Sequence, residues 1–185
     1  MPTHHLAENL RRLRRAAGLT LDGLAARAGV SRAMISKVER GASDPTATVL
    51  GKLAAGLDVS LSQLLGDRTP RSPRLLARRD QITFSDPLTG FGRRSLSPLF
   101  EDGALDFAFT TLPPGQSVSF APHHAGVEEY IAVHEGALVV VVGGERFALE
   151  TGDTLFYPGD RDHEYRNEGS APVAFYIVID DRAAR

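Results

Sequence analysis

Cysteine is absent from this 185-residue chain, and so are long apolar runs. Without cysteine the chain can form neither a disulfide framework nor a thiolate metal site. Apolar stretches such as Ala137–Val142 are far shorter than the roughly 20 residues that a membrane-spanning helix needs. The first residues also lack the basic and then apolar layout of a secretory signal peptide. We therefore expect a globular protein of the cytoplasm.

A strong overall charge is missing too, because the net charge is −2, but the charges are unevenly distributed. Residues 1–65 carry nine Lys or Arg and five Asp or Glu, a balance of +4. Residues 66–80 carry five and two (+3), whereas residues 81–185 carry seven and sixteen (−9). A basic N-terminal part and an acidic C-terminal part indicate that the N-terminal part binds a polyanion, unless the asymmetry is chance surface charge.

The hydrophobic pattern divides the chain into three zones. Residues 1–66 show helical periodicity with capping residues, and residues 81–185 alternate short β-like runs with Gly, Pro and Asp turns. Between them, residues 67–80 hold two prolines and five arginines, which is typical of a linker. We expect an α+β protein with an all-α domain of five helices at the N-terminus and an all-β domain at the C-terminus.

Capping residues mark the ends of the five expected helices. Gly18 ends the first helix, Thr20 and Ser31 cap the second and third, and Ser60 with Gln63 forms a capping box. The expected helices are Leu6–Ala17, Leu21–Ala28, Arg32–Arg40, a fourth that Pro45 and Thr46 open, and a short fifth after Ser60.

The stretch Leu21–Val38 has the residues that two helices joined by a tight turn require. Ala25 supplies a small residue where the helices cross, and Gly29 supplies the positive φ of the turn. With Val30, Ile35 and Val38 buried, the third helix presents short and basic side chains on its other face. Such a face can enter the major groove of DNA, where Arg and Lys reach base edges and phosphates. Its residues are Arg32, Ala33, Ser36, Lys37 and Arg40.

Individual roles follow from position on that helix. We interpret Arg32 and Ser36 as base readers, Arg40 as a phosphate clamp, and Lys37 as a contact to either. The helix end at Thr46 offers free backbone N–H groups to a phosphate, or it is an ordinary cap. A solvated helix face is the alternative for each residue alone. The predicted DNA-binding residues are Thr20, Ser31, Arg32, Ala33, Ser36, Lys37, Arg40 and Thr46.

This stretch resembles the phage-repressor, or xenobiotic-response-element, family of helix-turn-helix domains, over about the first third of the chain. The resemblance implies a transcriptional regulator that binds a double-stranded DNA operator. Leu21 departs from the family, which usually has glutamine there, so we expect binding to depend more on the third helix. The matching residues are Leu19-Thr20, Leu24-Ala25, Ala28 to Ser31, Ile35-Ser36, Glu39 to Gly41, Pro45 and the Leu50 to Leu64 tail.

Short runs separated by turn residues predict eight strands in the C-terminal zone. They are Leu105–Leu112, Val118–Phe120, Glu129–His134, Leu138–Val142, Arg146–Leu149, Thr154–Tyr157, His163–Arg166 and Val173–Ile179.

Two spaced groups of residues in this zone resemble the two signature motifs of the cupin family. The resemblance implies a double-stranded β-helix barrel that binds metals or small ligands. Asp160 replaces one family glycine, and Pro122 stands where the family has its first histidine. The first group comprises Gly115, Pro122-His123-His124, Glu129 and Gly136, and the second comprises Gly152-Asp153, Pro158, His163 and Asn167.

Carried over residue by residue, the cupin resemblance implies His124, Glu129 and His163 as possible ligands of a divalent metal, the minimum of a facial triad. His123 could substitute for the missing histidine, but its side chain should point the other way if that segment is extended. A metal-free pocket in which Glu129 pairs with His163 is the alternative. The expected effector pocket comprises His123, His124, Glu129, Ile131, Tyr157, His163 and Tyr165.

Two hypotheses follow. The first is a regulator without enzymatic activity, whose barrel binds a small-molecule effector and forms a homodimer. Such a dimer predicts DNA half-sites about one helical turn, roughly 34 Å, apart. The second is a mononuclear-iron cupin oxygenase that retains its helix-turn-helix domain, since the two-His, one-Glu set resembles that of an epoxidase acting on a hydroxyalkyl phosphonate.

Overall fold

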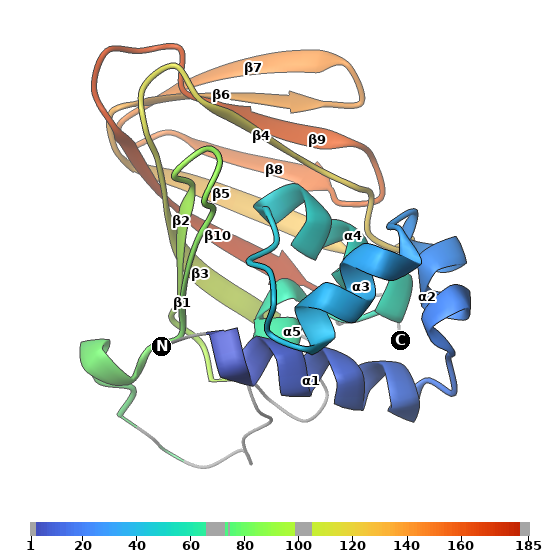
Figure 1. Cartoon of the computed structure of the whole chain (residues 1–185). Helices are drawn as coiled ribbons and strands as arrows, with labels where there is room; N and C mark the ends of the chain where they lie inside the picture. The colour runs from blue at the N-terminus through green and yellow to red at the C-terminus, as the bar shows by residue number, and fades with distance from the viewer. Residues whose placement is uncertain (1–2, 66–72, 74, 99–104, 182–185) are drawn as a thin grey trace.

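A computed structural model describes residues 3–65, 73, 75–98 and 105–181 of the chain. Five α-helices come first and ten strands follow, as Figure 1 shows. Half of the predicted linker, residues 67–72 and 74, lies outside the described residues, so the domain boundaries stay predictions. The helices are α1 (Thr3–Ala16), α2 (Leu21–Ala28), α3 (Arg32–Glu39), α4 (Ala47–Leu57) and α5 (Leu61–Leu65), with a short 3-10 turn at Arg78–Asp80.

The strands form two antiparallel sheets that face each other. One has the order β1-β2-β3-β10-β5-β8 and the other the order β4-β9-β6-β7. This arrangement is the cupin barrel that the sequence predicts. The strands are β1 (Thr83–Ser85), β2 (Gly92–Ser95), β3 (Leu105–Leu112), β4 (Ser117–Phe120), β5 (Glu128–Glu135), β6 (Ala137–Val142), β7 (Glu145–Glu150), β8 (Thr154–Pro158), β9 (His163–Arg166) and β10 (Val173–Asp180).

The predicted caps begin the helices of the N-terminal domain. The side chains of Thr20, Ser31 and Thr46 accept hydrogen bonds from the backbone N–H three residues on, which satisfies donors that a helix start leaves free. Ser60 and Gln63 bond reciprocally: the Ser60 N–H donates to Gln63 Oε1 (2.7 Å), and the Gln63 N–H donates to Ser60 Oγ (3.1 Å). No helix in the described part of the chain is long and apolar enough to cross a membrane.

The turn between α2 and α3 has the geometry that the sequence predicts. Gly29 ends α2 with a φ of 61°, a conformation that residues with a side chain rarely adopt.

A bidentate ion pair fixes α1 to α3: Arg14 Nε and Nη2 lie 2.6 and 2.9 Å from the two Glu39 carboxylate oxygens. Since both side chains are about nine-tenths buried, this pair stabilises the orientation of α3.

Alternating side chains fill the barrel. Along β5, Glu129, Ile131 and Val133 are buried, whereas Tyr130 and His134 are exposed. The inward residues meet those of the opposite sheet, so the barrel interior is a packed core. The eight predicted strands are present within one or two residues of their expected ends.

A buried polar junction joins the helical domain to the barrel. Asp106 of β3 accepts hydrogen bonds from the backbone N–H (3.2 Å) and hydroxyl (2.5 Å) of Ser62 in α5. The same carboxylate lies 2.8 Å from Arg93 Nη2 of β2. Close by, Asp86 accepts the N–H of Ala47 at the start of α4 (2.6 Å). The two domains are therefore packed together rather than joined only by a linker.

Candidate functional site

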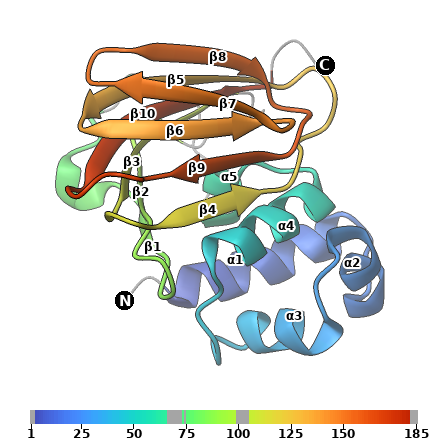
Figure 2. The same cartoon turned by 90° about the horizontal axis from the view of Figure 1, so that it is seen from above.

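The cationic face of α3 is open to solvent. Arg32, Ala33, Lys37 and Arg40 are exposed and Ser36 is half-buried, while Ile35 and Val38 on the other side are buried. Figure 2 shows α3 on the side of the helical domain away from the barrel, with α4 between α3 and β4. The structure thus brings the five predicted residues of α3 onto one accessible surface.

Local contacts orient two of these arginines. Arg32 Nε lies 3.2 Å from Asp22 Oδ1 of α2, and Arg40 Nε donates to the Ser36 carbonyl oxygen (3.1 Å). The Arg32–Asp22 pair is largely exposed, with side-chain exposures of 64% and 76%, so it costs little to break. Both guanidinium groups are therefore available to a polyanion.

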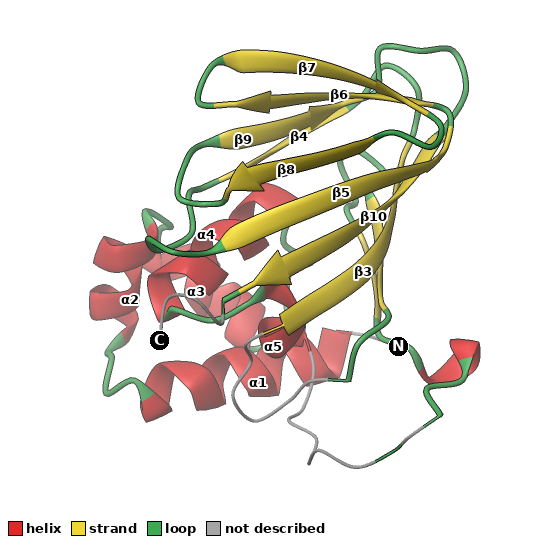
Figure 3. Ribbon diagram, turned by 180° about the vertical axis from the view of Figure 1, so that it is seen from behind, coloured by secondary structure: helices red, strands yellow, loops and turns green. Residues whose placement is uncertain are grey.

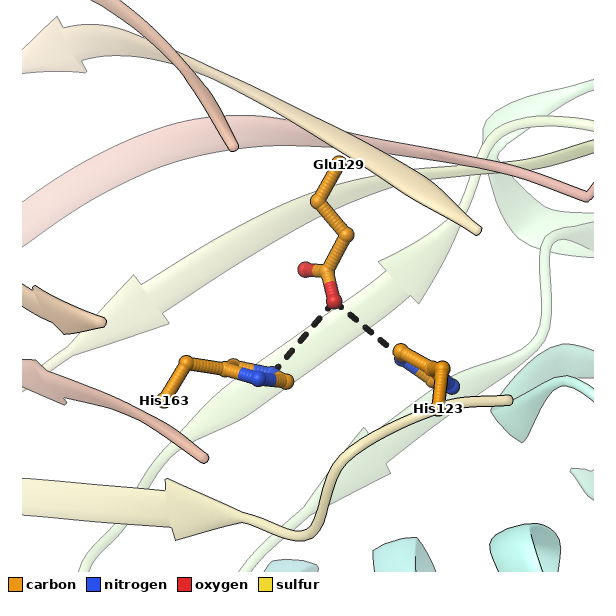
Figure 4. A group of neighbouring side chains, drawn as sticks. All are labelled: His123, Glu129 and His163. Atoms are coloured by element: carbon orange, nitrogen blue, oxygen red, sulfur yellow. Dashed lines mark ion pairs between the residues drawn. The ribbon is translucent and has the colours of Figure 1, made fainter. Parts of the chain in front are cut away.

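A second group of residues converges inside the barrel mouth, as Figure 4 shows. Glu129 projects from β5, His163 from β9, and His123 from the segment after β4. Glu129 Oε1 lies 3.2 Å from His123 Nε2 and 3.5 Å from His163 Nε2. Barrel closure brings together residues that are up to 40 positions apart in the chain.

Two tyrosines hold the other oxygen of Glu129. Tyr157 and Tyr165 donate to Oε2 at 2.7 and 3.1 Å, and their hydroxyls lie 2.9 Å from each other. Burial raises the pKa of both phenols well above the ordinary value, and the charge of Glu129 raises it further. Both hydroxyls therefore stay protonated as donors and fix the carboxylate with Oε1 toward the imidazoles.

The charge of the carboxylate is also set by this environment. Burial alone would raise the pKa of Glu129, but His163, His123 and the Tyr157 hydroxyl outweigh it and lower the pKa to about 2. Burial alone would lower the pKa of His123, whereas the nearby Glu129 carboxylate raises it. Glu129 is thus a buried anion that the neighbouring imidazoles and the Tyr157 hydroxyl stabilise.

The structure corrects the predicted ligand set, because His123 and not His124 faces Glu129 and His163. Residues 121–124 are an irregular loop, so the alternation of an extended strand does not apply to them. The backbone N–H of His123 bonds to the Gly159 carbonyl oxygen (2.9 Å), which fixes the loop against the barrel mouth. His124 points outward and contacts Asp58 Oδ1 and Asp181 Oδ1 at 2.9 and 2.7 Å.

The donor set fits a metal ion. The three ligand atoms lie within 4.8 Å of one another, close to the 3 to 4 Å that ligands about 2.1 Å from one metal require. His163 Nδ1 lies 3.0 Å from the Arg161 carbonyl oxygen, which can only accept, so Nδ1 carries a proton and Nε2 is the ring nitrogen left to bind a metal. Glu129 Oε1 has no hydrogen-bond partner among the described residues. A cation between these acceptors would satisfy both.

The cavity beside this centre is small, with a volume of about 40 Å³. Its wall includes Phe91, Arg93 and Phe120, which the sequence analysis did not identify. Phe120 could have been identified, because it is the large apolar residue that ends a predicted strand. The structure places it in register with His163 in the paired strands β4 and β9. Arg93 had none, because β2 lacks an alternating apolar pattern. Ile131, also predicted for the pocket, is buried in the core below.

Comparisons with known proteins match both parts of this fold. A helix-turn-helix family model matches residues 10–64, and a cupin domain model matches residues 108–179. The HTH-type transcriptional regulator SutR of Escherichia coli K12 is 31% identical over 174 residues, which cover 94% of this chain and 93% of that protein.

Solved structures agree with the sequence relatives. The chain is similar to an HTH_3 family transcriptional regulator from Vibrio cholerae, with a TM-score of 0.81, 31% identity and 97% coverage of both chains. It is also similar to hydroxypropylphosphonic acid epoxidase from S. wedmorenis, with a TM-score of 0.51, 18% identity, and coverage of 97% of this chain and 98% of that one. The second likeness shows the shared fold alone.

Fold and site together define a two-domain protein with a helix-turn-helix unit and a cupin barrel. Near full-length similarity at 31% identity extends this match across both domains. The chain belongs to the family of helix-turn-helix transcriptional regulators that carry a C-terminal cupin domain.

Proposed function

We propose that this protein is a sequence-specific DNA-binding regulator that reads double-stranded DNA with α3. The observation that supports this most strongly is the exposed cationic face of Arg32, Lys37 and Arg40 on a helix fixed by buried contacts. At the start of α4 the N–H groups of Ala47 and Val49 already donate to Asp86 (2.6 Å) and to Thr46 Oγ1 (3.3 Å), which supports the ordinary helix cap as the role of Thr46. DNA-binding relatives over the full length agree with this proposal.

We propose that the barrel senses a small molecule at the centre formed by His123, Glu129 and His163. A divalent metal held by these three residues would act as a Lewis acid toward an oxygen of the effector. The chain's own residues orient that site: Tyr157 and Tyr165 hold Glu129, and the Arg161 carbonyl oxygen holds His163. His124 is not part of this proposal.

We further propose that the centre serves sensing rather than catalysis. The relatives that match across both domains at 31% identity are transcriptional regulators, whereas the likeness to the epoxidase, at 18% identity, concerns the fold alone. An enzyme that does not bind DNA would have no use for the exposed cationic face of α3. An oxygenase of the epoxidase type would need stoichiometric iron and a substrate that is consumed.

A two-fold dimer in the cytoplasm is the form that we propose acts on DNA. No described helix covers the outer face of β5, β10 and β3 that Figure 3 shows. On that sheet, Tyr130 and Phe156 are 42% and 52% exposed and their rings lie 5.1 Å apart. Exposed aromatic side chains of this kind are enriched where proteins contact one another, and a second copy would bring a second α3.

Selection of genomic fragments by the purified full-length protein tests the proposed function. We expect enrichment of a sequence with two-fold symmetry and half-sites about one helical turn apart. Its affinity should fall steeply with salt, because Arg and Lys displace counterions from phosphates. Failure to enrich any fragment at low ionic strength would refute DNA binding. Enrichment of a single unpaired site would refute only the dimer.

A further inference from the structure

The centre of the barrel and the DNA-binding domain meet at α4. Gly51 and Ala54 of this helix form part of the wall of the small cavity that also contains Glu129 and His163. A residue of the DNA-binding domain therefore lies against the same space as the barrel residues that would hold a ligand. Two contacts connect α4 to the surroundings of the centre: an apolar one through Phe120, which packs on His163, and a polar one through His124, the neighbour of His123.

The apolar contact passes through Phe120. Its ring stacks on His163, with centroids 5.7 Å apart and planes inclined by 19°. Its other side is pressed against α4: a Cβ built on Gly51 would lie 3.0 Å from Phe120 Cδ1. Because only glycine leaves room for the ring, Phe120 cannot move toward the helix unless α4 moves as well.

The polar contact passes through His124, directly next to His123. Its two ring nitrogens lie 2.9 Å from Asp58 Oδ1 and 2.7 Å from Asp181 Oδ1. Asp58 is the C-cap of α4 and has a φ of 57°. The side chains of His124 and Asp58 are 44% and 67% exposed, and ion pairs that are exposed to water contribute little to stability. The His124–Asp58 pair can therefore open without unfolding the protein.

Helix α4 also contacts the DNA-reading unit. A Cβ built on Gly56 would lie 2.7 Å from the Ala28 side chain of α2, so these helices are in direct backbone contact. The turn at Gly29 then joins α2 to α3. A shift of α4 would therefore move α2 and, through the turn at Gly29, the DNA-reading helix α3.

The size of the space makes such a shift necessary for an organic ligand. The cavity at the centre holds about 40 Å³, whereas a cleft of about 260 Å³ lies just outside it. Asp58 of the DNA-binding domain lines this cleft together with His123 and His124. A ligand that reaches from the cleft to Glu129 must displace the His124 contact or the Phe120 ring.

We propose that α4 is the coupling element of this protein. Occupation of the centre displaces Phe120 and His124, and these contacts transmit the displacement to α4 and so to the DNA-binding surface. This inference rests on the proposed function, but it adds a route that DNA binding alone does not require. Because coupling between two sites is reciprocal, DNA itself can serve as the probe, with no need for the effector.

Hydrogen exchange tests this inference on the full-length protein. The amides of His123 and Val127 bond to the carbonyl oxygens of Gly159 and His124, so their exchange reports on the loop at the centre. We expect saturating operator DNA to change their exchange rates by about fivefold, the lower end of typical couplings. The double variant Phe120→Leu, Asp58→Gly should show less than about a third of this change.

Both substitutions are chosen to leave the folded state intact. Leucine keeps an apolar side chain at position 120, and glycine adopts the left-handed conformation of a helix C-cap without strain. The control is Arg146→Ala, which breaks another exposed ion pair, Arg146–Glu168 at 2.8 Å. It should keep the full DNA-dependent change. Circular dichroism and direct DNA titration accompany each variant.

Three results would overturn the inference. The first is a wild-type protein that binds operator DNA but shows no change in exchange at His123 and Val127. The second is a double variant that binds DNA and keeps the full change. The third is a wild-type protein that binds no DNA, which would refute the proposed function itself and is seen directly in the titration.

Discussion

Replacing Arg32 and Lys37 by alanine together is expected to abolish operator binding without unfolding the protein. Each side chain is exposed on α3, so its loss leaves no cavity and no buried unpaired charge. Removing one contact of this kind costs about 1 to 3 kcal/mol in DNA binding. The double variant should therefore bind at least about 30-fold more weakly, since about 1.4 kcal/mol corresponds to tenfold. Fluorescence anisotropy with the selected duplex measures the loss.

The matched control removes two positive charges from the barrel instead. Arg146 and Arg161 are exposed there, and their replacement by alanine changes the net charge of the protein by the same amount. We expect this variant to bind within about threefold of the wild type, because distant charges are screened at physiological salt. Equal loss in both variants would mean that only net charge matters. Unchanged affinity of the α3 variant would contradict the assignment of the recognition helix.

The second large effect concerns metal binding, where the structure separates two adjacent histidines. Cobalt(II) is a suitable probe because its visible absorption reports ligation directly. We expect His123→Ala to weaken cobalt binding at least about 100-fold, because it removes one of three ligands; loss of an outer-shell partner alone costs about 10- to 100-fold. His124→Ala, the matched control, should bind cobalt as the wild type does.

Glu129→Gln should behave like His123→Ala, since the buried carboxylate supplies the negative charge that faces both imidazoles. Two results would contradict the centre as described. One is a His124→Ala variant that loses cobalt as severely as His123→Ala. The other is a wild-type protein that shows no cobalt absorption at stoichiometric metal, which would leave an organic effector as the ligand of the same three residues.

Local sequence rules were sufficient for much of this fold. The caps at Thr20, Ser31 and Thr46 depend on bonds within three residues, so they can be identified without knowledge of the rest of the chain. The same holds for the turn at Gly29. The strands of the barrel core alternate buried and exposed residues, as in β5, and that pattern is also local.

Contacts between distant segments could not be predicted in the same way. Strands β1 and β2 are short, and β2 contains Arg93 and Arg94 where an apolar pattern would be needed. Arg93 is buried only because Asp106 and Ser62, from two other elements, surround it. The packing of α4 on Phe120 likewise depends on Gly51. A glycine within a helix does not indicate, from the sequence alone, which residue packs against it.

The centre formed by His123, Glu129 and His163 shows how one wrong assumption about the backbone changes a predicted site. The cupin resemblance implies Glu129 and His163 as ligands, and both lie on strands with their side chains buried in the barrel. The same resemblance implies His124, and the side chain of His123 would point away only if residues 121–124 were extended. The loop instead follows the hydrogen bond from His123 to Gly159, a contact across the barrel mouth that no local rule contains. The roles of these residues in sensing, and of α3 in DNA reading, stay predictions.

A cleavage reagent attached to α3 tests the central claim most directly. Because the chain has no cysteine, the variant Ala33→Cys carries a unique attachment point on the exposed face of the helix. With iron–EDTA tethered there, we expect cleavage of the selected duplex in two clusters about one helical turn apart. The same reagent on Gln116→Cys, at the barrel turn before β4, should produce none. Cleavage from the barrel position alone, or from neither position while the protein is bound, would contradict DNA recognition by α3.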